Sequence, residues 1–151
     1  MSGLSSPEVA AAYDAVRSDK DDITWLLVAN PSPTSKDLTL TKTGTTKTGT
    51  GDVTALAAEL QDDQVQYGYV RVEYANDSES TRVKFALIVW IGENTKVMRK
   101  ARVSIEAGEV RRVLAHHSIQ VNASDKSDLD LQDIVKRLRK AGGADYNGGR
   151  G

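Results

Sequence analysis

Hydrophobic positions near the start of the chain recur with the spacing of an α-helix. Val9, Tyr13 and Val16 are three or four residues apart, which predicts a helix with one buried face. A serine, a proline and a glutamate precede Val9. This order is typical of a helix start. The serine hydroxyl can accept hydrogen bonds from free N–H groups of the first turn, and proline suits that turn. A glutamate there is stabilised by the positive N-terminal end of the helix dipole. We expect the helix to end near Asp19.

Other segments have the pattern of β-strands, namely short apolar or alternating runs that end at turn residues. The expected strands are residues 23–29, a brief one at 38–40, residues 65–74, residues 83–91 and residues 119–121. Residues 83–91 (VKFALIVWI) are the most apolar and predict the most buried strand. Residues 65–74 alternate, which predicts a strand with two unlike faces.

Between the early strands lies a repeat, with TKTGT at 41–45 and again at 46–50. It has almost nothing to bury, so we expect a mobile loop over 41–50.

Helical spacing returns in three later segments. A short helix capped by Asp52 would bury Val53, Leu56 and Leu60. A long helix over 99–115 would bury a stripe and bend near Gly108 or Ser104; the stripe is Val103, Ala107, Val110 and Leu114. A last helix would begin at Ser127 or Asp128 and end at Gly142–Gly143.

This order of elements predicts an α+β fold, with a mixed sheet flanked by helices on both faces. The length of 151 residues suits one domain. We expect that domain to cover 1–143, with a flexible tail over 144–151.

Charge and composition narrow the classes of partner. Twenty Lys and Arg oppose 21 Asp and Glu, giving a net charge of −1, so overall charge does not favour nucleic acid or membrane. There is no cysteine and therefore no thiolate zinc site. No apolar run approaches the ~20 residues of a membrane-spanning helix, and the N-terminus does not resemble a secretory signal. We expect a cytoplasmic, monomeric protein.

Signals for catalysis are weak. Gly44 and Gly49 have the glycine spacing of a phosphate-binding loop, but Thr50–Gly51 stands where that motif needs lysine and then serine or threonine. His116 and His117 are the two histidines; neighbours on a helix point about 100° apart and do not readily share a metal. We find no nucleophile with a base and its orienting group, and expect no enzyme, cofactor or metal.

Three basic clusters remain on this otherwise balanced chain. They are Arg82 and Lys84; Arg99, Lys100, Arg102, Arg111 and Arg112; and Lys136, Arg137, Arg139 and Lys140. On a continuous helix Lys100 and Arg111 would share one side. Any single base is equally well explained as part of a solvated face. The clusters together favour an acidic protein partner.

Several motifs in this sequence resemble the coactosins, within the actin-depolymerising-factor-homology (cofilin-like) family. The resemblance rests on AAYDAVRSD at 11–19, DD followed by YGYVRV at 62–72, KFALIVWIGEN at 84–94 and KAGGADY at 140–146. It covers nearly the whole chain. It implies a five- to six-stranded mixed sheet and binding to the sides of actin filaments without strong severing.

The resemblance also implies two binding surfaces. One comprises the N-terminus and the long helix, here residues 2–6, Arg99, Lys100, Arg111 and Arg112. The other comprises the start of the central strand and the last helix, here Arg82, Lys84, Lys136, Arg137 and Arg139. Lys84 matches the lysine that is expected to touch the filament, whereas Thr81 stands where relatives tend to carry a base.

Two further hypotheses remain open. The chain could be an adaptor of the same fold that binds another protein and touches actin weakly or not at all, or a cofilin-like binder of monomeric actin. If the basic clusters carry the contact, binding should weaken as salt rises, because charges are screened over ~8 Å at physiological ionic strength.

Overall fold

The computed structural model describes residues 3–32, 35–45, 52–75 and 81–148, and only the backbone at 52 and 142–148. Its elements follow in chain order. They are the 3₁₀ turn η1 (Gly3–Ser5), α1 (Pro7–Arg17), β1 (Trp25–Ala29), β2 (Thr39–Gly44), α2 (Asp52–Ala57), β3 (Val65–Ala75), β4 (Thr81–Ile91), α3 (Val97–Lys100), α4 (Val103–Val113), β5 (Ile119–Ala123), the 3₁₀ turn η2 (Lys126–Leu129) and α5 (Leu131–Gly148).

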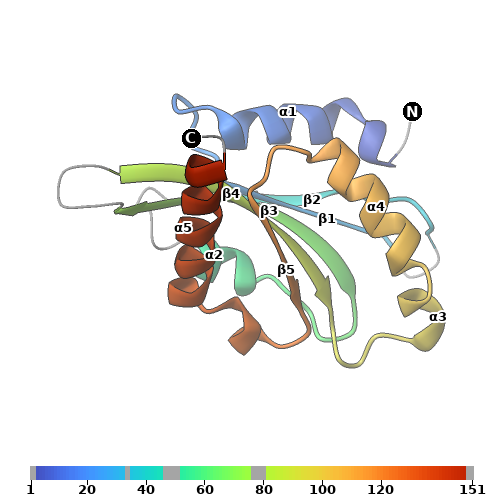
Figure 1. The fold of residues 1–151 in the computed structure, drawn as a ribbon. Helices are drawn as coiled ribbons and strands as arrows, with labels where there is room; N and C mark the ends of the chain where they lie inside the picture. Colours follow the sequence, from blue (N-terminus) through green and yellow to red (C-terminus); the bar gives the residue numbers. More distant parts are fainter. Residues whose placement is uncertain (1–2, 33–34, 46–51, 76–80, 149–151) are drawn as a thin grey trace.

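One five-stranded sheet organises the described chain, in the order β2-β1-β3-β4-β5 (Figure 1). Neighbouring strands are antiparallel except β4 and β5, which are parallel. A parallel pair requires a crossover connection, which α3 and α4 provide. The predicted fold class, a mixed sheet with helices on both faces, is confirmed.

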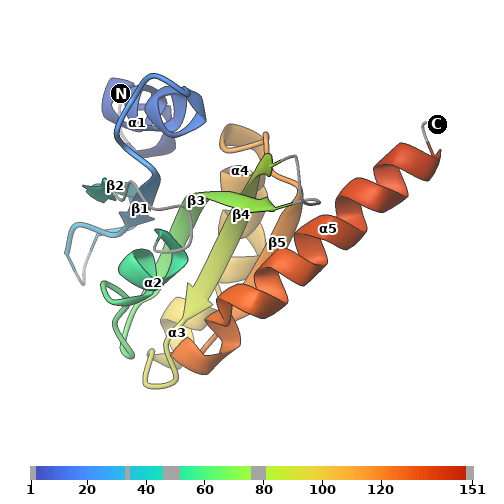
Figure 2. The same cartoon turned by 90° about the vertical axis from the view of Figure 1, so that its left-hand side faces the viewer.

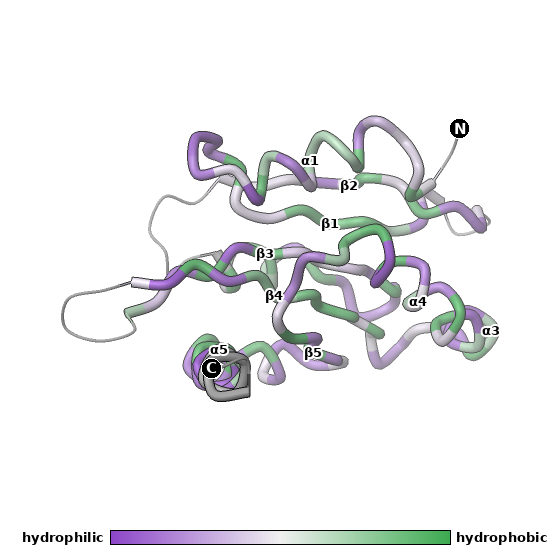
Figure 3. Tube along the Cα trace, turned by 45° about the horizontal axis from the view of Figure 1, so that its top comes forward, coloured by the Kyte–Doolittle hydropathy of each residue, from purple (hydrophilic) through white to green (hydrophobic). Residues whose placement is uncertain are grey.

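Each face of the sheet buries its own apolar layer, because successive side chains of a strand point to opposite faces. On β3, Tyr67 and Tyr69 pack on the side of α1 and α4, whereas Val70 and Val72 pack on the side of α2 and α5. The two predicted faces of this strand are thus both largely buried. Figures 2 and 3 show the helical layers on either side of the apolar strands.

The first helix begins as predicted. The Ser6 hydroxyl accepts a hydrogen bond from the Val9 amide at 3.4 Å, and Pro7 is the first helical residue. The helix ends at Arg17, two residues before the expected end, and β1 begins at Trp25.

The predicted loop over 41–50 is wrong in its first part, since β2 runs from Thr39 to Gly44. β-branched threonines suit an edge strand, and β1 supplies the hydrogen-bonding partner. Gly44 is needed there, because a Cβ would lie 2.0 Å from the Trp25 indole. Residues 46–51 lie outside the described chain.

The predicted long helix over 99–115 is two helices. α3 ends at Lys100, Ala101 caps it, and α4 begins at Val103, so the break precedes both predicted bend positions, Ser104 and Gly108. Lys100 and Arg111 therefore do not share one side of a continuous helix. The predicted stripe is confirmed, since all four of its residues are buried.

The last helix differs from the prediction at both ends. Asp125 and Asp128 form a capping box around η2, and α5 starts only at Leu131. The helix also continues past Gly142–Gly143 to Gly148, and its C-terminal part projects beyond the sheet (Figure 2). Flexibility of 144–151 and the domain boundary at 143 stay predictions. No helix within the described ranges combines the length and the apolar character that crossing a membrane requires.

Candidate functional site

The first basic cluster lies at the start of β4, on the face of the sheet that α5 covers. In the β3–β4 ladder, Arg82 pairs with Tyr74 and Lys84 with Val72. Tyr74 and Val72 pack with α5, and paired residues share a face. Arg82 is exposed and Lys84 is half-buried, so the stem of Lys84 packs on the sheet while its ammonium group is left for solvent or a partner.

Arg139 of α5 joins this cluster. Its Nη2 donates to the Ala75 carbonyl oxygen at 2.6 Å, and its guanidinium lies 5.6 Å from the centre of the Tyr74 ring. Lys136 is one turn earlier on α5 and is exposed, so it lies on the same side. We call Arg82, Lys84, Lys136 and Arg139 the hairpin surface.

Two further predicted residues meet at the β5 edge of the sheet. Arg111 of α4 donates to Gln120 Oε1 at 3.2 Å, and Arg137 of α5 donates to the Gln120 carbonyl oxygen at 2.9 Å. Gln120 thus brings together a base from each layer of helices. Arg112 is exposed beside Arg111.

No acidic partner of these cations is found among the described residues. Within the described ranges, ion pairs join Arg17 to Asp14, Lys42 to Glu59, Arg71 to Asp19 and Arg99 to Glu106. None involves the hairpin surface or the bases at β5. Among the described residues, the positive charge on these surfaces is therefore not neutralised by an ion pair, which favours an acidic partner.

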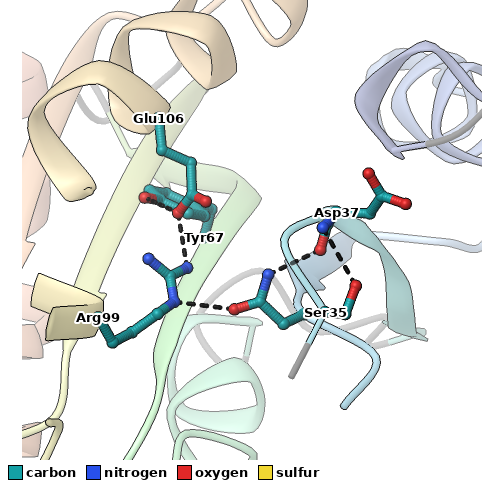
Figure 4. A network of polar contacts seen from close by, with 6 residues as sticks. Ser35, Asp37, Tyr67, Arg99 and Glu106 are labelled. Atoms are coloured by element: carbon teal, nitrogen blue, oxygen red, sulfur yellow. Dashed lines mark hydrogen bonds and ion pairs between the residues drawn. The ribbon is translucent and has the colours of Figure 1, made fainter. Parts of the chain in front are cut away.

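Arg99 is different, because its charge is already used inside the fold. Its side chain is 15% exposed, and Nη2 lies 2.6 Å from Oε1 of Glu106, whose side chain is 12% exposed. The Tyr67 hydroxyl donates to the same oxygen at 2.6 Å (Figure 4). Burial, and then the hydrogen bond to Glu106, raise the pKa of Tyr67 far above its ordinary value. Tyr67 is therefore a neutral donor to this carboxylate.

Sequence reasoning missed an apolar surface on α3 and α4. Val97, Met98 and Ile105 are 79%, 82% and 76% exposed; we call these three residues the α3 patch. Beside Ile105, a groove of about 450 Å³ runs between α4, η1 and residues 36–38. The available signal was that Ile105 is apolar but lies off the buried stripe of α4.

The resemblance implied two binding surfaces, and the structure groups their residues differently. Arg111 of the first surface and Arg137 of the second meet at Gln120. α3, with Arg99 and Lys100, lies at the opposite end of the molecule from the β3–β4 hairpin (Figure 1).

The histidines serve the fold. The backbone N–H of His116 donates to the Tyr13 hydroxyl at 2.9 Å, and His117 Nδ1 lies 2.7 Å from the Leu114 carbonyl oxygen. Among described residues, no three His, Cys, Asp or Glu side chains are grouped to hold a metal ion.

Comparison with known proteins identifies the family. The family model described as "Cofilin/tropomyosin-type actin-binding protein" matches residues 2–139. The coactosin of Dictyostelium discoideum is 33% identical over 99% of this chain and 98% of its own length. This chain is a member of the coactosin family. The resemblance seen in its motifs is confirmed.

Other coactosins and the wider fold agree with this assignment. The human coactosin-like protein is 29% identical, over 91% of this chain and 89% of its own. The crystal structure of coactosin from Entamoeba histolytica superimposes with a TM-score of 0.81 at 28% identity, covering 95% of this chain and 100% of that one. A Streptomyces griseoflavus cofilin shares the fold, with a TM-score of 0.75 at 13% identity.

Proposed function

We propose that this coactosin-family protein binds the sides of actin filaments through its hairpin surface and regulates filament dynamics without strong severing. It acts as a monomer in the cytoplasm, on the actin cytoskeleton. The observation that carries the proposal is that Arg139 of α5 contacts Tyr74 and Ala75 of β3, next to the part of β4 that carries Arg82 and Lys84. Family membership supplies the partner, and these exposed and half-buried cations supply the means of recognition.

Several weak contacts can together hold an acidic polymer. A single exposed ion pair contributes about 0.2–1 kcal/mol, so no one base is expected to carry the affinity alone. Four neighbouring cations add their contributions and steer the approach of an acidic surface. Binding should therefore weaken as salt rises.

Lys84→Ala tests the proposal by co-sedimentation with purified filaments. Lys84 is half-buried without an ion pair among the described residues, so its loss should leave the melting temperature nearly unchanged while the bound fraction falls. Lys126→Ala, which removes an exposed lysine of η2, is the matched control. An unaltered bound fraction for Lys84→Ala below saturation removes Lys84 from the site.

A second candidate function, binding of monomeric actin, is favoured by the α3 patch. Val97 and Met98 lie on α3 and Ile105 in the first turn of α4, which follows it in the chain, and exposed apolar side chains that together form a patch mark a protein interface. Met98→Ala should weaken monomer binding while leaving the hairpin surface intact. If the wild-type protein binds neither monomeric actin nor actin filaments, the remaining hypothesis is an adaptor of the same fold that binds another protein.

A further inference from the structure

No residue of the short helix α3 is buried in the hydrophobic core. Of its four residues, Val97, Met98 and Lys100 are exposed, and only Arg99 is partly covered. So short a helix does not hold its conformation alone, since forming the first turn costs more than its few hydrogen bonds return. Buried Thr95 and Val103 lie on either side of α3, and within α3 itself Arg99 is the residue whose side chain bonds to other parts of the described fold.

The Arg99 guanidinium reaches two other parts of the fold at once. Nε donates to Asn30 Oδ1 at 2.8 Å, just after β1, while Nη2 donates to Glu106 Oε1 of α4 at 2.6 Å. Glu106 is fixed in turn by Tyr67 of β3. The Asn30 amide donates to the Asp37 carbonyl oxygen at 2.7 Å, which ties in the segment that lines the groove (Figure 4).

The planar fork of arginine suits this arrangement, because its N–H groups point in fixed directions and satisfy two acceptors at once. A lysine ammonium is a point charge on a flexible stem. In this network the groups around Arg99 lie just after β1, on β3 and on α4.

We propose that Arg99 is a positioning residue: it locks α3 in the orientation that presents Val97 and Met98 at the end of the molecule where α4 begins, so that the α3 patch docks on actin. The idea rests on the proposed function, in its actin-binding form. It assigns Arg99 an indirect role, in place of the direct contact that the sequence predicted. It also explains why a helix with no buried residue has a defined place at the edge of the molecule.

The mobility of α3 can be measured without any partner. The chain has no cysteine, so Val97→Cys offers a single site for a spin label. The test variant is Arg99→Met with Glu106→Gln, which removes both charges together and lets residue 106 still accept from Tyr67. Replacing a buried ion pair by neutral groups of similar volume is often nearly neutral for stability, so the protein should remain folded, as circular dichroism will show.

We expect the label at 97 to become clearly more mobile in the double variant. A label at Ala10, an exposed site on α1, should not change. Equal mobility at 97 with and without the Arg99 network overturns the proposal.

Binding to monomeric actin, measured on unlabelled protein, is the second readout. If α3 keeps its docking orientation about a tenth of the time in the double variant, the apparent Kd rises about tenfold. The control is Arg17→Met with Asp14→Asn, which removes an exposed ion pair of α1 and should bind like wild type. A folded double variant with wild-type affinity overturns the positioning role.

Failure of the proposed function looks different. If wild-type protein does not bind actin, the function is wrong, and the mobility of the label still decides whether Arg99 holds α3. If wild type binds but Met98→Ala and Ile105→Ala have no effect, the α3 patch is not the docking surface, and this inference fails while filament binding through the hairpin surface stands.

Discussion

The tight turn after β4 offers a sharp test of the fold, because Gly92 lies against backbone atoms of another segment. A Cβ on Gly92 would stand 2.3 Å from both the carbonyl carbon and the oxygen of Asp62. Neither atom belongs to a flexible side chain that could move aside. Gly92→Ala must therefore push the turn away from the segment before β3.

The size of the destabilisation depends on the hydrogen bonds that this displacement would strain. The Gly92 amide donates to the Gln64 carbonyl oxygen at 2.9 Å, and the Asn94 amide donates to the Asp62 carbonyl oxygen at 2.7 Å. Overpacking costs about 1–3 kcal/mol and each weakened hydrogen bond about 0.5–1.5 kcal/mol. We expect a loss of roughly 2–6 kcal/mol in the free energy of unfolding, which lowers Tm by roughly 4–24 °C in a chain of this size.

Thermal and urea unfolding followed by circular dichroism measure this loss. Gly108→Ala is the matched control, because Gly108 lies inside α4 and its added Cβ meets only the end of the Arg111 side chain, at 3.6 Å. Alanine in place of glycine within a helix should stabilise the protein by about 0.5–1 kcal/mol. The reasoning is refuted if Gly92→Ala unfolds with the wild-type midpoint, or if the two substitutions shift Tm in the same direction.

Two more outcomes are expected from the buried layers. Ile134→Ala, which empties a fully buried position of α5, should cost about 2–5 kcal/mol in urea unfolding; a loss below about 1 kcal/mol would show that α5 is not packed as described. The raised pKa values of Tyr67 and Tyr69, due first to burial, mean that the folded state keeps protons that unfolded tyrosines release near pH ~10. Their contribution is present below that pH and is lost progressively as pH rises from there toward the raised pKa of the folded state. Tyr69→Phe should therefore flatten the alkaline fall in stability measured from pH 8 to 11, and an unchanged slope would contradict this.

Local patterns were sufficient for most elements. The serine cap and the first-turn proline of α1, the apolar run of β4 and the stripe of α4 each depend on neighbours within one turn or one strand, and all were predicted correctly. Boundaries set by distant contacts were predicted less well. β2 is a strand because β1 pairs with it. The threonines and lysine of β2 do not by themselves indicate that such a partner is present.

The same distinction holds for the candidate site. The sequence shows which residues carry positive charge, and its motifs indicate the family. The meeting of Arg139 with β3, and of Arg111 with Arg137 at Gln120, comes only from the packing of both helical layers on one sheet.

Arg99 is the clearest case of what the tertiary structure decided. Its sequence neighbours suggested one more surface base, yet the fold places Glu106, Asn30 and Tyr67 around it and uses its charge internally. The chain by itself therefore determined composition, family and the type of most elements, because these follow from residue identity and short-range spacing. Which charges are available to a partner was decided in three dimensions, because burial and pairing depend on residues far apart in the chain.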